Sequence, residues 1–146
     1  MKQHTLIDKA FLLKRSPLFH ALDLDILLTI ADRLGSVTLE ANDSAFGVDE
    51  EANRMYFIIE GSVEIRSSDH QVIVTLTAGD FFGEESLFSS KPRAYAAFSP
   101  TETHLLTLSR TNLYSIISEC PSVAVGFLQV YTSAMPNRPF KTRPAS

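Results

Sequence analysis

The feature that most constrains the fold is a series of short β-favouring runs in the middle of the chain. Each run has four to six residues and is bounded by turn-forming residues. Several short strands at such close spacing predict an antiparallel sandwich or barrel. In one run, Val63-Glu64-Ile65-Arg66, apolar and charged residues alternate, which directs Val63 and Ile65 to the interior. The runs are 55–59, 62–66, 72–76, 95–98 and 103–108.

Helical periodicity flanks this β-rich region on both sides. Before it, apolar residues recur at helical spacing, and Gly35 is placed to end the second helix. After it, Thr111 is expected to cap a short helix to about Ser118, and Pro121 to open another. The apolar positions are Leu6, Ala10, Leu13, Leu24, Leu27, Leu28, Ala31 and Leu34 before the strands, and Val123, Phe127, Val130, Tyr131 and Ala134 after them.

A segment between two of the β runs holds the parts of a site for a small phosphate ester. Residues 82–87 read Phe-Gly-Glu-Glu-Ser-Leu, and residues 92–94 read Pro-Arg-Ala. Gly83 lets the backbone approach a ligand closely, and a short helix starting at Glu84 would direct amide groups at an anion. Arg93 supplies a permanent positive charge. A carboxylate beside an anion site indicates a ligand that carries hydroxyl groups as well as phosphate.

A structural ion pair between Glu84 and Arg93 is the alternative interpretation. Burying both charges costs several kcal/mol. Such a pair also requires neither the preceding glycine nor the short helix. The spacing therefore favours ligand binding.

The segment 82–94 resembles, without gaps, the phosphate-binding cassette of the cyclic nucleotide-binding domain family, the sensor module of the catabolite activator protein and of the regulatory subunits of cAMP-dependent protein kinase. The resemblance runs over about residues 11 to 134. It rests also on Ser16-Pro17-Leu18-Phe19, on Tyr56-Phe57-Ile58-Ile59-Glu60-Gly61, on Gly79-Asp80-Phe81-Phe82 and on Leu105-Leu106-Thr107-Leu108-Ser109-Arg110.

The resemblance implies a role for each cassette residue. Glu84 would accept a hydrogen bond from the ribose 2'-hydroxyl, and Arg93 would pair with the cyclic phosphate. Gly83 and the backbone amides near Glu85, Ser86 and Ala94 would complete the cradle, and Ile65, Ile73 and Phe81 would line the pocket. In the family a hydroxyl residue directly after the arginine favours cGMP. Because Ala94 stands there, cAMP is the favoured ligand and cGMP the second choice.

The family fold would be mainly β with flanking helices: an antiparallel jelly-roll of about eight strands (a double-stranded β-helix), with N-terminal helices and two C-terminal helices. The predicted domain covers residues 1–135. Residues 136–146 contain three prolines and no acidic residue, which predicts a disordered tail. The family also implies a homodimer through the last helix, and the output would require a separate effector protein.

Charge and motif content exclude several function classes. Residues 1–135 contain 10 basic and 17 acidic residues, so this acidic body argues against binding nucleic acid. No apolar run reaches the length of a membrane span, and one cysteine with no leader sequence predicts a cytoplasmic protein. The four histidines stand singly, and no catalytic motif occurs, so we expect neither an enzyme nor a metal or other cofactor.

Three departures from the family keep a second interpretation open. The turn before Tyr56, which family members usually build with glycine, reads Asp49-Glu50-Glu51-Ala52-Asn53. Tyr95 stands where a small residue is common, and either narrows the pocket or packs outside. The last helix is too short to supply the family's distal lid residue. A ligand-free jelly-roll that binds another protein is therefore the alternative, with a pocket filled by Tyr95 as its signature.

Overall fold

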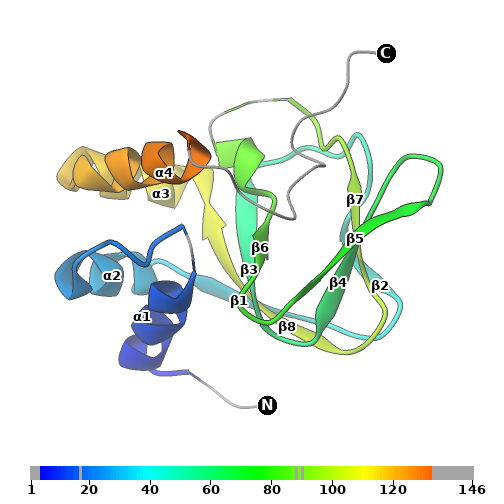
Figure 1. The fold of residues 1–146 in the computed structure, drawn as a ribbon, viewed down its shortest axis with the longest axis horizontal. Coiled ribbons are helices and arrows are strands. Elements are labelled where there is room, and N and C mark those ends of the chain that lie inside the picture. Colours follow the sequence, from blue (N-terminus) through cyan, green and yellow to red (C-terminus); the bar gives the residue numbers. More distant parts are fainter. Residues whose placement is uncertain (1–3, 17, 88, 90, 133–146) are drawn as a thin grey trace.

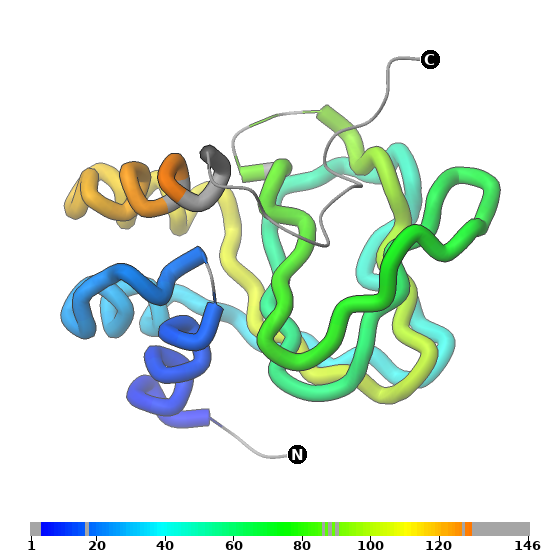
Figure 2. The backbone as a smooth tube through the Cα atoms, in the orientation of Figure 1, coloured from blue at the N-terminus to red at the C-terminus, as the bar shows by residue number. Residues whose placement is uncertain are grey.

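The computed structural model describes residues 4–16, 18–87, 89 and 91–132. Over these ranges the chain forms a sandwich of two β-sheets, with the helices gathered at one end, on the left in Figure 1. Figure 2 follows the chain from the blue helices through the sandwich and back to the orange helices, which lie beside the first ones. The predicted order of helices, strands and helices is confirmed.

The strands pair antiparallel in two four-stranded sheets. One sheet has the order β1-β8-β3-β6 and the other β2-β7-β4-β5, which confirms the predicted jelly-roll. The five predicted runs form β3, β4, β5, β7 and β8, with ends shifted by at most one residue. The described strands are β1 (Gly35–Leu39), β2 (Asp43–Phe46), β3 (Arg54–Glu60), β4 (Ser62–Arg66), β5 (Val72–Thr77), β6 (Phe81–Phe82), β7 (Ala96–Ser99) and β8 (Thr103–Ser109).

Four helices flank the strands in the described ranges. Helix α1 (Leu6–Arg15) begins with a capping box, and α2 (Leu24–Ala31) follows it. Helix α3 (Arg110–Glu119) leads directly into α4 (Ser122–Thr132). None of these helices is both long and apolar enough to cross a lipid bilayer.

Two predicted helix boundaries are wrong. Ser109, not Thr111, caps α3: its extended backbone ends β8, and its hydroxyl accepts a hydrogen bond from the Asn112 amide at 3.1 Å. Gly35 does not end α2 but begins β1. Because a turn bond from the Arg33 amide to the Ile30 carbonyl (2.9 Å) already closes the helix end, no glycine is needed there.

The apolar side chains form two cores, one on each face of the sheet that contains β3. The first lies between this sheet and the helices and includes Leu13, Leu27, Phe57 and Phe81. The second fills the inside of the sandwich. Strand β6 joins them, because its two residues point to opposite faces: Phe81 packs in the helix-side core and Phe82 inside the sandwich. The residue that follows is Gly83.

Some predictions fall outside the described residues. These are the disordered tail, the domain boundary at residue 135, Ala134, Pro17 of the resemblance motif, and the side chains of Phe127, Val130 and Tyr131 in the predicted stripe. Within the described part of that stripe, Val123 is fully buried. Pro121 directly precedes α4, as expected of a residue that opens a helix.

Candidate functional site

Gly83 is the point at which the chain leaves β6. Its φ of +79° lies in the left-handed region, which residues with a side chain rarely adopt. A Cβ atom at this position would lie 2.9 Å from Nη1 of Arg93 and 3.3 Å from the carbonyl oxygen of Arg54. Glycine is therefore required here by both conformation and space. A single 3₁₀ turn, η1 (Glu84–Leu87), follows at the predicted position. It is a single turn rather than the short helix expected from the sequence, and it is too short to have an appreciable helix dipole.

Arg93 points into the protein, and only 3% of it is exposed. Its Nη1 donates to the carbonyl of Gly83 at 3.0 Å, and its Nη2 donates to the carbonyl of Arg54 at 2.6 Å. The guanidinium lies 4.0 Å from the centre of the Phe46 ring. These partners are neutral, and Nε has no hydrogen-bond partner among the residues that the structure describes. Burial lowers the pKa of Arg93, yet a guanidinium stays charged at neutral pH.

The turn η1, which follows Gly83, carries two carboxylates. Glu84 is completely buried in η1. Glu85 brings Oε1 to 3.9 Å from Nη1 of Arg93, at the outer limit of an ion pair. The charge of Arg93 is thus only weakly balanced by Glu85, and a buried charge without a close counter-ion is costly.

The loop before β3 holds the backbone of Arg93 in place. The Asp49 amide donates to the Arg93 carbonyl at 2.7 Å, and the Arg93 amide donates to the Glu50 carbonyl at 2.9 Å. Asp49 has a φ of +70°, so it adopts the left-handed conformation that glycine usually supplies. The polar loop therefore provides this turn conformation without glycine.

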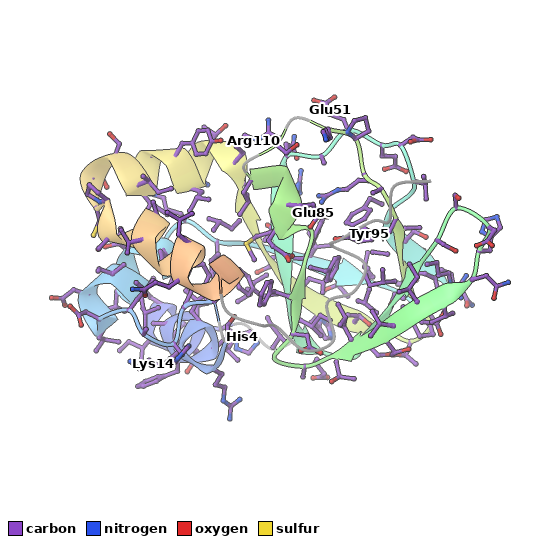
Figure 3. All side chains as sticks on the ribbon, turned by 45° about the horizontal axis from the view of Figure 1, so that its top comes forward. His4, Lys14, Glu51, Glu85, Tyr95 and Arg110 are labelled. Carbon is purple, nitrogen blue, oxygen red and sulfur yellow. The ribbon has the colours of Figure 1, made fainter. Side chains whose placement is uncertain are left out.

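Tyr95 closes the interior side of the site. Its hydroxyl accepts a hydrogen bond from the Gly83 amide at 3.0 Å, and its ring packs 5.6 Å from the Phe46 ring. Burial, followed by the negative charge of Glu85, raises the pKa of Tyr95 well above 10.0. Figure 3 shows Glu85 and Tyr95 beside each other at this site. Of the two placements that the sequence left open for Tyr95, the inward one is confirmed.

A family model described as "Cyclic nucleotide-binding domain" matches residues 36–120, which is more than half of the chain. The chain belongs to the cyclic nucleotide-binding domain family. The match includes η1, Arg93 and Tyr95. The family assignment therefore covers the part of the chain that contains the candidate site.

Two curated proteins are similar to this cyclic nucleotide-binding domain. A cyclic nucleotide-gated potassium channel of Mesorhizobium japonicum is 32% identical over 74% of this chain and 30% of the channel. A CRP-like cAMP-activated global transcriptional regulator of Mycobacterium tuberculosis is 28% identical over 82% of this chain and 55% of the regulator. The chain thus spans about a third to a half of these curated relatives.

One solved structure is similar over most of its own length as well as most of this chain. The N-terminal domain of a transcriptional regulator from Streptomyces coelicolor A3(2) is 30% identical, with a TM-score of 0.75, over 83% of this chain and 87% of that one. The likeness therefore covers the sandwich together with flanking helices.

The structure brings together the cassette, which we define as residues 83–87 and 92–94. Gly83, Glu85 and Arg93 are joined by the contacts described above, and Glu84 is buried in the same turn. Ser86 contributes its backbone to η1, and Ala94 packs against the interior core. The binding roles of these residues remain predictions.

The predicted lining residues lie in three different environments. Ile65 is fully buried inside the sandwich. Ile73, on β5, is 41% exposed. Phe81 belongs to the helix-side core and packs against Phe57, with ring centres 6.4 Å apart. Of these three residues, only Ile65 therefore lies in the interior core, which also contains Tyr95.

Three contributions to the site were missed by sequence reasoning. The carbonyl of Arg54 and the ring of Phe46 both contact Arg93. Arg110, at the start of α3, donates from Nη2 to the carbonyls of Ala52 and Ser89, each at 2.8 Å. Its motif Leu-Ser-Arg was used only as a family signature. Arg110 ties α3 to the loop before β3 and to the segment after η1.

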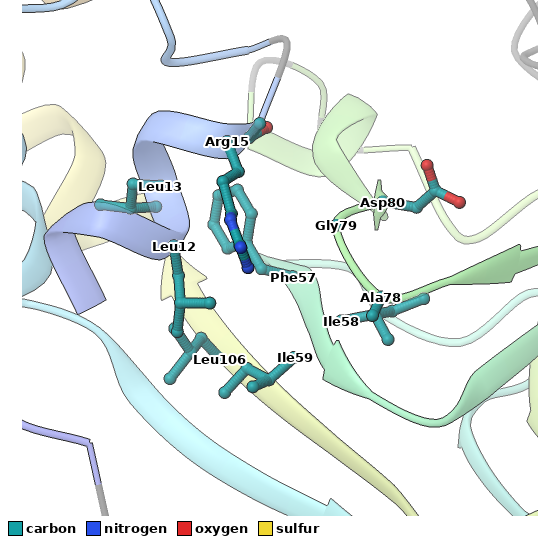
Figure 4. A pocket seen from close by; sticks show the side chains of 11 residues that line it. Leu12, Leu13, Arg15, Phe57, Ile58, Ile59, Ala78, Gly79, Asp80 and Leu106 are labelled. Carbon is teal, nitrogen blue, oxygen red and sulfur yellow. The ribbon is translucent and has the colours of Figure 1, made fainter. Parts of the chain in front are cut away.

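A separate hollow of about 360 Å³ lies on the helix side of the sheet (Figure 4). Its walls come from the last turn of α1, from β3 and β8, and from the turn before β6. Arg15 and Asp80 are its charged residues. No residue of the cassette lines it, so this hollow is distinct from the nucleotide site predicted from the sequence.

Proposed function

We propose that this domain binds a cyclic mononucleotide, preferably cAMP, and acts as a sensor rather than an enzyme. The observation that carries the proposal is the buried Arg93 guanidinium. Its hydrogen-bond partners among the described residues are neutral carbonyls, and its Nε has none. A phosphate monoanion would supply the missing counter-charge. Membership of the family supports the same ligand class.

Each cassette residue has a defined task in this proposal. Arg93 would pair with the cyclic phosphate through Nε and the Nη protons that the carbonyls leave over, a geometry that lysine cannot reproduce. Glu84 would accept the ribose 2'-hydroxyl, and the amides of Glu85, Ser86 and Ala94 would complete the cradle. Because Ala94 has no hydroxyl, cAMP is favoured over cGMP.

The response would travel from the cassette to the C-terminal helices. Arg110 connects α3 to the segment after η1, so a movement of the cassette would change the position of α3. We propose that a separate cytoplasmic effector reads this movement. A homodimer through α4 is consistent with the exposure of Val125 and Leu128, at 51% and 63%.

The test is ligand-dependent stability, measured by thermal unfolding with cAMP, cGMP and 5'-AMP. Ligand at a hundred times its Kd adds about 2.7 kcal/mol, which raises the Tm of a chain this size by about 8 °C. We expect the largest shift with cAMP and none with Arg93→Ala. Arg93→Lys keeps the charge but loses the planar fork, so it should bind weakly.

Arg66→Ala is the matched control. Arg66 also stacks on a phenylalanine ring, 3.8 Å from the centre of Phe98, but on the outer face of the sandwich. This variant should keep the full shift with cAMP. An unshifted wild-type Tm at millimolar concentrations of all three nucleotides would contradict the proposal.

A second candidate function is a ligand-free protein-interaction module. The observation in its favour is that Tyr95 occupies the interior of the sandwich, with only 2% exposed. In that case cyclic nucleotides would leave the Tm of the wild type and of Tyr95→Ala equally unchanged. Binding by Tyr95→Ala alone would instead show that the tyrosine blocks a nucleotide site.

A further inference from the structure

Arg93 and Tyr95 hold both main-chain polar groups of Gly83. The Arg93 side chain donates to the Gly83 carbonyl at 3.0 Å, and the Gly83 amide donates to the Tyr95 hydroxyl at 3.0 Å. The two side chains reach the same glycine because they are two residues apart in the segment that leads into β7, and both are buried. Gly83 is therefore fixed between them in its left-handed conformation.

The Tyr95 ring makes this contact a rigid one. It is 2% exposed and packs in the interior core with Phe46 and Tyr56. The Phe46 ring contacts both partners, since the guanidinium of Arg93 lies over its centre at 4.0 Å and the Tyr95 ring is 5.6 Å away. A side chain held in this way positions its hydroxyl with little freedom, unlike a hydroxyl on an exposed residue.

Loss of the hydroxyl would therefore change more than one hydrogen bond. The Gly83 amide would lose its partner in a buried place, where an unsatisfied donor is costly. Gly83 would rotate to recover a partner, and its carbonyl would move with it. Nη1 of Arg93, which is bound to that carbonyl, would then leave its present position.

We propose that Tyr95 is a positioning residue that fixes Arg93 through Gly83, and that nucleotide affinity depends on its hydroxyl. This inference deepens the proposed function and rests on it for the ligand. A phenol at this point is thus part of the anion site, not an obstruction to it. It sets the direction in which the guanidinium meets the phosphate.

The experiment compares Tyr95→Phe with Tyr56→Phe in the full chain. Both tyrosines lie in the interior core, and Tyr56 stacks on Phe82 at 4.9 Å, so the two variants lose the same atom from the same cluster. The affinity for cAMP is measured by calorimetry. Nitrogen-15 NMR follows the Gly83 amide and the Arg93 Nε–H in the absence of nucleotide.

We expect Tyr95→Phe to raise the Kd for cAMP about tenfold, the effect of one hydrogen bond in a buried charged site. The Gly83 amide should exchange faster with solvent, and the Arg93 Nε–H resonance should shift. Tyr56→Phe should leave the Gly83 resonance unchanged and the Kd within twofold of the wild-type value. Because the Tyr56 phenol also interacts electrostatically with Arg93, the Arg93 resonance should shift, but less than in Tyr95→Phe. A merely structural tyrosine would lower stability without moving the Arg93 resonance.

The two readouts separate this inference from the proposed function. Unchanged Gly83 and Arg93 resonances in Tyr95→Phe would overturn the positioning role, whatever the nucleotide does. A Kd in Tyr95→Phe equal to or lower than the wild-type value would overturn it too. Shifted resonances in a protein that binds no nucleotide would support the positioning role and refute the proposed function.

Discussion

Substitution of Gly83 by alanine tests the geometry of the cassette most directly. A residue with a Cβ atom at a φ of +79° costs about 1–2 kcal/mol relative to glycine. The added Cβ would also lie 2.9 Å from Nη1 of Arg93, so the guanidinium must move. Moving it breaks the 3.0 Å hydrogen bond to the Gly83 carbonyl, and such a bond to a charged group contributes about 1.5–3 kcal/mol. We therefore expect a loss of about 3–4 kcal/mol in the free energy of unfolding.

Gly79→Ala is the matched control for this prediction. Gly79 also has a positive φ, +97°, but a Cβ atom there would meet nothing within 4 Å. It lies in the turn closed by the bond from the Asp80 amide to the Thr77 carbonyl. In this variant the free energy of unfolding should fall only by the cost of the backbone conformation, about 1–2 kcal/mol. The difference of about 2 kcal/mol between the two variants isolates the contact with Arg93.

Both free energies can be measured by urea unfolding at 25 °C, followed by circular dichroism, with the slope m compared between variants. An equal loss of stability in Gly83→Ala and Gly79→Ala would refute the reasoning. It would mean that the guanidinium is not held against Gly83. Arg93→Ala provides a further check, because in its background the two glycine variants should lose the same amount.

Three further outcomes are expected. Burial in the folded protein raises the pKa of Tyr95 above 10.0, so the neutral phenol stabilises the fold fully below pH 10, and this contribution is lost as the pH rises through the folded pKa. The free energy of unfolding should therefore fall more steeply above pH 10 in the wild type than in Tyr95→Phe. Ser109→Ala removes the cap of α3 and should cost about 1 kcal/mol by urea unfolding, whereas Thr111→Ala should cost almost nothing. Arg110→Gln should speed amide exchange in the loop before β3, and an unchanged rate would count against its role as a link.

Most strands could be predicted because the pattern that identifies each one lies in consecutive residues of the sequence. In β4, Val63 and Ile65 are fully buried and alternate with the ion pair of Glu64 and Arg66, as their polarity requires. Strand β6 could not be found in this way. It has only two residues, and Phe82 as well as Phe81 is buried because helices cover one face and the second sheet covers the other. Burial on both faces follows from tertiary packing, which no local pattern contains.

The cassette could be proposed from the sequence because its side chains are chemically distinctive. Glycine, two carboxylates and an arginine in a fixed order have few explanations, and the family motif narrows these further. The partners of Arg93 could not be predicted, since they are the carbonyls of Gly83 and Arg54, and every residue has a carbonyl. The long-range contact of Arg110 with Ser89 could not be predicted either, because it too is a hydrogen bond to a backbone carbonyl.

The segment from Arg93 to Ser99, which ends in β7, shows where hydrophobic alternation misleads. From residue 93 to 99 the chain alternates between buried and half-buried positions, and Arg93, Tyr95 and Ser99 are among the buried ones. Phe98 is left on the outer face, where Arg66 covers its ring. Polarity alone would have assigned these faces the other way round. Burying an arginine while a phenylalanine of the same segment stays on the outer face lowers the stability of the fold. Natural proteins retain such unfavourable placements chiefly at functional sites. The reversal at Arg93 thus supports the proposal that this segment carries a binding residue.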